Sequence, residues 1–228
     1  MYKGKRVAAV ILAAGNGSRM GSSENKVCLL LDGRQMIEHT LWAFAKHSYV
    51  DELVLAVRDD ERAEMEALAS QMGKPTRVVI GGATRQASVY AAISELKSEI
   101  VLVHDGARPL VRGTCIAACV EALDRYDGVI PVLPIEEQVC RVGKKRSARP
   151  EALKQALYGA QTPQCFDTKI LRRCHERHRE AAASTDDSRL LEIEGYKVGV
   201  VEGDPVNIKI TTPLDLLVVK AYLESEIE

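Results

Sequence analysis

Short apolar runs alternate along the chain with longer segments of helical spacing. The run at 7–13 is apolar throughout, and a continuous run is typical of a strand covered on both faces. The segment 36–47 instead places Ile37, Leu41 and Phe44 on one helical face. Strands are predicted on these grounds at 53–57, 77–80, 100–103, 128–133 and 196–201. Helices are predicted at 59–72, 85–96, 113–126 and 167–179, with a last helix capped by Thr212.

This order of elements predicts an α/β fold, a doubly wound and mostly parallel sheet with helices on both faces. Ligands of such sheets bind beyond the carboxyl ends of the strands. Three segments rich in glycine or charge follow predicted strands, at 14–21, 81–82 and 104–108. We therefore expect these three segments to meet at one edge of the sheet.

The segment 135–157 departs from this pattern. It is polar and basic, and its alternation is strand-like only at 139–142. It is consistent with a solvated insertion, and equally with a β-arm that leaves the domain and meets another subunit. The rest of the 228 residues reads as a single domain, without internal repeats.

Composition excludes several classes of function. The net charge is -1 and aromatic residues make up 4% of the chain, so neither a basic field nor stacking platforms for nucleic acid are expected. No segment approaches the roughly 18–20 apolar residues of a membrane span. The apolar run at 7–13 is too short for a signal peptide and enters a glycine loop, so we expect a cytoplasmic protein.

Six cysteines are present, and none of them forms a C-x-x-C pair. Cys115 and Cys119 are spaced to share one face of a helix, but no histidine stands nearby at ligand spacing. The cysteines are therefore expected to be reduced packing residues rather than metal ligands.

The loop at 14–21 has the composition of a phosphate cradle, because small residues let backbone N–H groups approach an anion. Its glycines are Gly15, Gly17 and Gly21, so the third comes one residue late for a dinucleotide-binding fingerprint. A P-loop is excluded because no Lys-Ser/Thr pair follows Gly21. Arg19 and Lys26 supply two cations, which favours a triphosphate ligand over an ordinary turn with exposed basic residues.

Asp105 follows a predicted buried strand, where ligands bind. One carboxylate that faces a triphosphate is typical of a Mg²⁺ site, although a turn or capping role would also explain it. His104 adjoins Asp105, but no serine or cysteine elbow precedes it, which disfavours a hydrolase. His175 and His178 lie on a charged segment and are expected at the surface.

Several motifs together resemble one family, the 2-C-methyl-D-erythritol 4-phosphate cytidylyltransferases of non-mevalonate isoprenoid synthesis. The matching segments are LAAGNGSRMG (12–21), Lys26, GG-x-x-R-x-x-SV (81–89), VHDGARP (103–109), QTPQ-x-F (161–166), TDD (185–187), VEG (201–203) and NIKITTP-x-DL (207–216). The resemblance implies a Rossmann-like nucleotidyltransferase sheet with a protruding β-arm. It also implies a reaction in which CTP with Mg²⁺ binds first, an alditol phosphate attacks the α-phosphorus, and pyrophosphate leaves.

The resemblance also assigns roles to residues by position. Catalytic cations are expected at Arg19, Lys26, Lys154 and Lys209, the last also holding the acceptor phosphate. CTP contacts are expected at Ala13, Ala14, Gly15, Gly17, Gly81, Gly82, Ser88, Asp105, Gly106 and Ala107, with Asp105 also contacting Mg²⁺. The acceptor is expected to contact Arg108, Thr162 and Thr185. The arm at 135–157 is expected to swap across a homodimer and to bring Lys154 to the partner's site.

The chain departs from the family pattern at a few positions. Asn25 precedes the catalytic lysine where proline is usual, and Thr84 replaces an acid before Arg85. In the arm, Gln138 and Lys154 replace the usual threonine and arginine. These changes leave two alternatives open. One is a cytidylyltransferase that acts on ribitol 5-phosphate, and the other is a nucleotide-binding regulator without turnover.

Overall fold

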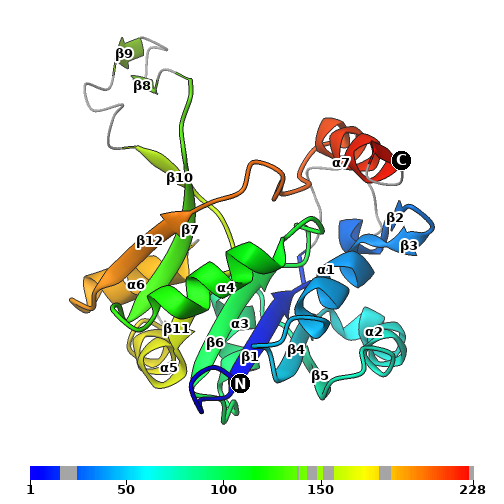
Figure 1. The fold of residues 1–228 in the computed structure, drawn as a ribbon, viewed down its shortest axis with the longest axis horizontal. Coiled ribbons are helices and arrows are strands. Elements are labelled where there is room, and N and C mark those ends of the chain that lie inside the picture. Colours follow the sequence, from blue (N-terminus) through cyan, green and yellow to red (C-terminus); the bar gives the residue numbers. More distant parts are fainter. Residues whose placement is uncertain (16–24, 138, 143–147, 151–156, 180–185, 226–228) are drawn as a thin grey trace.

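A computed structural model describes residues 1–15, 25–137, 139–142, 148–150, 157–179 and 186–225. Within these residues eight strands form one sheet, in the order β10-β7-β11-β6-β1-β4-β5, with β12 also paired to β7 (Figure 1). The strands are β1 (Val7–Leu12), β4 (Glu52–Val57), β5 (Thr76–Ile80), β6 (Ile100–Asp105), β7 (Gly128–Pro134), β10 (Tyr158–Ala160), β11 (Gln164–Asp167) and β12 (Val198–Glu202).

The predicted doubly wound, mostly parallel sheet is confirmed. β1 pairs in parallel with both β4 and β6, β4 with β5, and β12 with β7. The sequence pattern did not predict β10 or β11. β11 runs antiparallel between β6 and β7, which separates two strands that follow each other in the chain.

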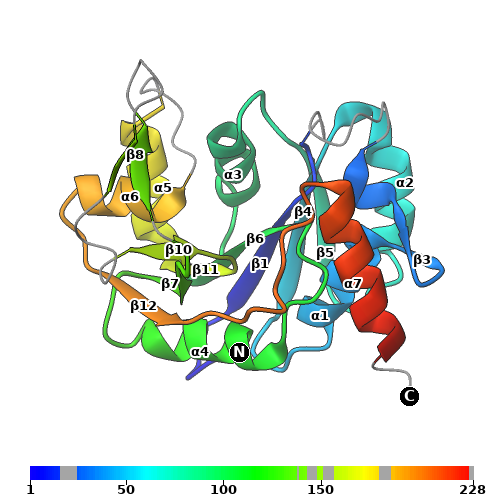
Figure 2. The same cartoon turned by 90° about the horizontal axis from the view of Figure 1, so that it is seen from above.

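Helices cover both faces of the sheet (Figure 2). They are α1 (Met36–Ala45), α2 (Arg62–Ala69), α3 (Arg85–Ile93), α4 (Gly113–Ala122), α5 (Thr168–Arg177), α6 (Asp187–Ile193) and α7 (Pro213–Ser225). Short 3₁₀ turns η2 (Lys26–Cys28) and η3 (Asp59–Glu61) precede α1 and α2. The helix predicted at 59–72 is therefore shorter than expected, and so are those at 85–96 and 113–126.

The alternation of side chains along the strands divides the core into two layers. Val7, Ala9 and Ile11 of β1 face one layer, where α1, α2 and α4 pack. Ala8 and Val10 face the other, where α3, α5 and α6 pack. Because both faces are covered, β1 is apolar at every position, as its sequence predicted.

Two small hairpins lie outside the main sheet. β2 (Leu30–Leu31) pairs with β3 (Arg34–Gln35) ahead of α1. β8 (Cys140–Val142) pairs with β9 (Ala148–Pro150), and this ladder projects from the body beyond β7 and β10 (Figure 1). The strand predicted at 139–142 is thereby confirmed. Within the described part of the chain, none of the helices combines the length and apolar character needed to cross a bilayer.

Candidate active site

The carboxyl edge of the sheet brings the predicted segments together. The Ala13 N–H donates to the Ala56 carbonyl at 2.8 Å, and the Gly106 N–H donates to the Leu12 carbonyl at 2.9 Å. These bonds extend the parallel ladders beyond the ends of β1 and β6. The loops that follow these strands therefore leave the sheet side by side, as expected from the sequence.

The Gly81-Gly82 turn packs tightly against the start of the glycine loop. A Cβ atom on Gly81 would lie 2.5 Å from Ala14 Cβ and 2.8 Å from Ser88 Oγ, so only glycine fits there. The Ser88 hydroxyl accepts a hydrogen bond from the Gly82 N–H at 3.1 Å and lies 3.0 Å from the Thr84 carbonyl. Four of the predicted CTP-contacting residues, Ala14, Gly81, Gly82 and Ser88, thus pack against one another.

Lys26 is positioned by the residue before it. Asn25 is 2% exposed, and its side-chain amide donates to the Ala13 carbonyl and to Glu61 Oε2, each at 2.8 Å. The Lys26 ammonium donates to the Ile210 carbonyl at 2.9 Å. Asparagine therefore anchors this segment through hydrogen bonds, at a position where the family pattern has proline.

Residues 207–210 carry a second lysine to the same edge. The Ile210 N–H donates to the Ala107 carbonyl at 2.9 Å, which ties this segment to the end of β6. The Lys209 ammonium lies 2.8 Å from Asp105 Oδ2. Lys26 contacts the carbonyl of Ile210, the residue after Lys209, so both predicted catalytic cations reach this segment, and Lys209 lies beside the carboxylate expected to face the nucleotide.

Asp105 is the centre of a cluster of positive charge. It is 9% exposed, and besides Lys209 it lies 3.7 Å from Arg108 Nε and 3.8 Å from Arg85 Nε. Burial alone would raise the pKa of Asp105, but Lys209, Arg85 and Arg108 outweigh it and hold that pKa well below the ordinary range. Asp105 is therefore ionised, and the cluster retains a surplus of cations for an anionic substrate.

His104 belongs to a closed chain of hydrogen bonds beside Asp105. Its Nε2 lies 3.1 Å from the Arg108 carbonyl, which can only accept, so Nε2 carries the proton. Its Nδ1 then accepts from the Thr162 hydroxyl at 3.0 Å, and Thr162 Oγ1 accepts from the Asp105 N–H at 3.1 Å. Burial lowers the pKa of His104 to about 4, so the ring is neutral and both of its nitrogens are occupied.

Among the described residues, two buried polar atoms without a hydrogen-bond partner lie near this hydrogen-bonded group, on Arg108 and Asn207. Arg108 donates through Nη1 to the Asn207 carbonyl at 2.7 Å, and the Asn207 side chain donates to the Thr162 carbonyl at 2.7 Å. Arg108 Nε and Asn207 Oδ1 are buried without a hydrogen-bond partner in the described structure. Such atoms are uncommon in native proteins and fit a site that a polar ligand completes. Asn207 was not predicted as a site residue, although it begins the quoted NIKIT motif.

Four predicted site residues lie outside the described residues: Gly17, Arg19, Lys154 and Thr185. Gly15 is exposed, and it precedes the first gap. Gly106 packs closely, since a Cβ there would lie 2.8 Å from Ile37 Cδ1.

Thr84, another departure from the family pattern, caps α3 by accepting a hydrogen bond from the Ala87 N–H at 3.0 Å.

The prediction that His175 lies at the surface is wrong. Its side chain is buried, and Nε2 lies 2.9 Å from Asp187 Oδ1. Asp187 also binds the Arg85 guanidinium at 2.5 Å. The charged composition of α5 hid this contact, because its partners come from α3 and α6. His178 is partly exposed and lies 2.8 Å from Glu194.

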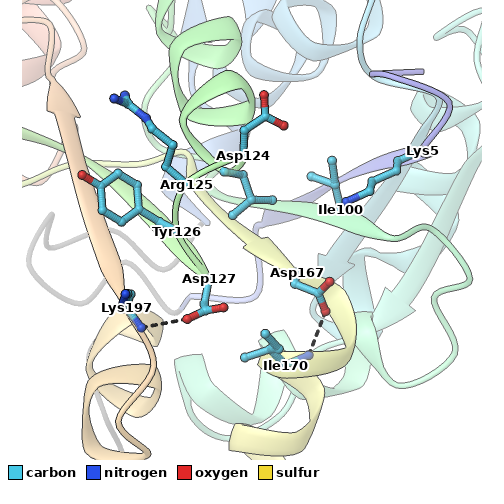
Figure 3. Close-up of a pocket in the computed structure, with 10 residues that line it drawn as sticks. Lys5, Ile100, Asp124, Arg125, Tyr126, Asp127, Asp167, Ile170 and Lys197 are labelled. Carbon is cyan, nitrogen blue, oxygen red and sulfur yellow. Dashed lines mark hydrogen bonds between the residues drawn. The ribbon is translucent and has the colours of Figure 1, made fainter.

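We find no second candidate for an active site in the described structure. No group of three or more His, Cys, Asp or Glu side chains suited to a metal occurs among the described residues. A hollow at the opposite edge of the sheet is shown in Figure 3. Its Asp127 accepts from the Lys197 N–H at 2.9 Å, and its Asp167 caps α5 through the N–H groups of residues 169 and 170. These carboxylates have structural roles.

Comparison with known proteins shows the family of this chain. A family model described as IspD, 2-C-methyl-D-erythritol 4-phosphate cytidylyltransferase, matches residues 7–225. The chain belongs to this family. The cytidylyltransferase of that name from Bacillus cereus is 39% identical over 219 residues, covering 94% of this chain and 96% of that protein. Its counterpart from Alkaliphilus metalliredigens is 36% identical over 98% of this chain and 95% of that protein.

Solved structures show the same fold. The 4-diphosphocytidyl-2C-methyl-D-erythritol synthase from Anaerococcus prevotii aligns with a TM-score of 0.86 at 31% identity, over 97% of this chain and 100% of that one. The cytidylyltransferase from Thermus thermophilus aligns with a TM-score of 0.81 at 32% identity, over 96% and 99% of the two chains. Like its family, the chain transfers a cytidylyl group from CTP to 2-C-methyl-D-erythritol 4-phosphate, in isoprenoid biosynthesis. The family match therefore identifies 2-C-methyl-D-erythritol 4-phosphate, rather than ribitol 5-phosphate, as the acceptor.

Proposed function

We propose that the reaction occurs at the carboxyl edge of the sheet, in front of Asp105. CTP lies against the backbone of residues 13–15 and 81–82, and the acceptor phosphate lies toward Arg108 and Lys209. The observation that carries this assignment is that Lys209 lies 2.8 Å from Asp105 while Lys26 binds the carbonyl of the next residue, Ile210. Cations on both sides of one phosphorus fit a reaction that depends on charge stabilisation.

The bond changes need no protein base. An oxygen of the acceptor phosphate, already anionic at neutral pH, forms a bond with the α-phosphorus of CTP. The bond from that phosphorus to the bridging oxygen breaks, and pyrophosphate leaves with the electron pair. His104 takes no part, because it is neutral and both of its ring nitrogens hold internal hydrogen bonds. Lys26, with Arg19 in the same role, stabilises the charge on the pentacoordinate phosphorus.

We propose Mg²⁺ as the metal of this site. Mg²⁺ is commonly held by one or two carboxylates together with substrate phosphates. Asp105 supplies one carboxylate, and the described residues offer no all-protein cage, so the donor set fits an ion that arrives with the nucleotide. When bound, the ion neutralises part of the phosphate charge. Asp105 would hold it through the oxygen that Lys209 leaves open.

Replacing Lys26 tests the catalytic assignment. We expect Lys26→Ala to lower kcat by about 10²–10³-fold, the usual effect of losing one transition-state contact, while CTP binding survives at least partly. Pyrophosphate release with methylerythritol phosphate measures turnover, and calorimetry measures CTP binding. Lys5→Ala, at the opposite edge of the sheet, is the matched control. Unchanged turnover in Lys26→Ala would remove this lysine from the mechanism.

We propose that 135–157 is a dimerisation arm inserted in a single domain, 1–228. The β8–β9 ladder supports this, because within the described structure it pairs only with itself and lies outside the main sheet. The swapped arm brings Lys154 to the partner's acceptor site, so Lys154→Ala should raise the acceptor KM. Mixing Lys154→Ala with Lys26→Ala should restore activity, since one site of each mixed dimer is then complete. A monomer at assay concentration, by light scattering, would contradict the arm.

We also propose a cytoplasmic location. None of the six cysteines forms a disulfide in the described structure, which supports a reducing compartment. Cell fractionation of the native host tests the proposal, and recovery of the protein outside the cytoplasmic fraction would contradict it.

A further inference from the structure

A buried ion-pair relay connects α5 and α6 with Asp105. Asp187, the first residue of α6, is 1% exposed, and both of its oxygens are occupied. Oδ2 binds Arg85 Nη1 at 2.5 Å, and Oδ1 lies 2.9 Å from His175 Nε2. None of these three residues was predicted to belong to the site.

Arg85 lies between two carboxylates and is bound by only one of them. It is hydrogen-bonded to Asp187, whereas its Nε stays 3.8 Å from Asp105 Oδ1, beyond hydrogen-bond distance. Burial alone would raise the pKa of Asp187, but Arg85 and His175 lower it, so this carboxylate is ionised and can compete for the guanidinium.

The two oxygens of Asp105 consequently differ. Oδ2 binds Lys209 at 2.8 Å and faces Arg108 at 3.7 Å. Oδ1 pairs with Arg85 at 3.8 Å, without a hydrogen bond. A guanidinium free of Asp187 could move onto Oδ1 and form the forked pair that arginine makes with carboxylates.

We propose that Asp187 is a positioning residue that holds Arg85 back from Asp105 and so keeps Oδ1 open for the Mg²⁺ of the bound nucleotide. His175 fixes the orientation of the Asp187 carboxylate. This inference rests on the metal role proposed above and extends it to residues that do not touch the substrates.

Packing of the helices does not by itself require this relay. The side chains of Gln86 and Arg172 tie α3 to α5 through hydrogen bonds to the carbonyls of His178 and Ile93. Glu194 ties α6 to α5 through ion pairs with Arg177 and His178. Buried ion pairs add little net stability on average, because desolvation offsets the attraction. A role in placing charge explains the relay better than a role in folding.

The test measures how CTP binding depends on Mg²⁺, by calorimetry without acceptor. In Asp187→Asn we expect the Mg²⁺ concentration for half-maximal CTP binding to rise about tenfold, because a cation that moves from 3.8 Å to hydrogen-bond distance competes more strongly for Asp105. The double variant Arg85→Gln/Asp187→Asn should return to within about twofold of the single variant Arg85→Gln, since the competing cation is then gone. Glu194→Gln, which loosens the same helix pair elsewhere, should behave as the wild type.

Each result separates the possibilities. An unchanged Mg²⁺ requirement in Asp187→Asn would overturn the proposal, and so would an equal shift in Glu194→Gln. A shift in Asp187→Asn that persists in the double variant would show that Asp187 does not act through Arg85. If Asp187→Asn does not fold, His175→Asn is used instead. We expect a smaller rise in the Mg²⁺ concentration for half-maximal CTP binding, and an unchanged concentration would contradict the proposal. If Mg²⁺ has no effect on CTP binding to the wild type, the metal role itself fails.

Discussion

Acid should destabilise the folded protein through His104, before the carboxylates titrate. The His104 ring is fully buried, and its pKa falls from an ordinary value near 6.5 to about 4. A difference of that size corresponds to about 3 kcal/mol, since each tenfold change in proton affinity is worth about 1.4 kcal/mol. This is a substantial part of the stability of a typical domain, about 5–15 kcal/mol.

The sign follows from which state binds the proton. Below pH 6.5 the unfolded chain protonates this histidine, whereas the folded protein does so only near pH 4. The contribution of His104 is therefore fully present above pH 6.5 and is lost as the pH falls toward 4. Between pH 7 and pH 5 the loss should be about 2 kcal/mol. Asp105 and Asp187 have lowered pKa values, so their contributions are lost only at lower pH.

Urea unfolding at pH 7, 6 and 5 measures this effect. His104→Gln is the matched variant, because glutamine can still bond to Thr162 and to the Arg108 carbonyl but does not titrate. We expect the free energy of unfolding of the wild type to fall more steeply than that of the variant, by about 2 kcal/mol over this range. The difference between the free energies of unfolding of the wild type and the variant excludes the contribution of His47, whose pKa is also lowered by burial. Parallel loss in both proteins would refute the reasoning.

Three further predictions follow from packing, hydrogen bonding and thiol burial. Gly81→Ala should destabilise the protein by about 1–3 kcal/mol and weaken CTP binding, because the new methyl would meet Ala14 at 2.5 Å; urea unfolding and calorimetry measure both. Thr162→Val should cost about 1–3 kcal/mol in urea unfolding, because its hydroxyl bonds on two sides. Iodoacetamide at pH 8 should label exposed Cys140 while sparing Cys165, whose pKa is raised by burial, as judged by peptide mass spectrometry.

The chain offers matched controls for these predictions. Gly159→Ala adds the same methyl where the nearest heavy atom is 3.9 Å away, so an equal loss there would contradict the packing argument for Gly81. Thr162→Ser keeps the hydroxyl and should retain most of the stability, and a valine variant as stable as the serine variant would remove the hydrogen-bond role. Rapid labelling of Cys165 in the folded protein would contradict its burial.

Much of the fold followed from local patterns. Continuous apolar runs predicted β1, β4 and β6, because strands buried on both faces need apolar residues at every position. β11 escaped prediction because its residues, Gln164–Asp167, neither alternate between polar and apolar nor form a continuous apolar run. Its strand conformation depends on pairing with β6 and β7, which only the folded sheet provides.

In the candidate site, too, the sequence predicted the residue types and only the folded structure showed their contacts. Small residues at 14–21 with the cations Arg19 and Lys26 predicted a phosphate site, and Asp105 at a strand end predicted a metal ligand, because these residue types bind anions and cations through their own chemistry. The helix that carries His175 was predicted, but the burial of His175 was missed, because composition does not reveal a contact with Asp187 on another helix.

The sequence by itself indicated the parallel strands of the main sheet, a candidate phosphate-binding loop and the family. Only the tertiary structure decided which of the side chains at this edge of the sheet are charged. Lys26 reaches the carbonyl of a residue 184 positions away, and Arg85 reaches a carboxylate 102 positions away. Electrostatic energies depend on distance in space and on burial, neither of which a linear order of residues contains. The neutral His104 and the ionised Asp105 are therefore properties of the fold, although the residues themselves could be read from the chain.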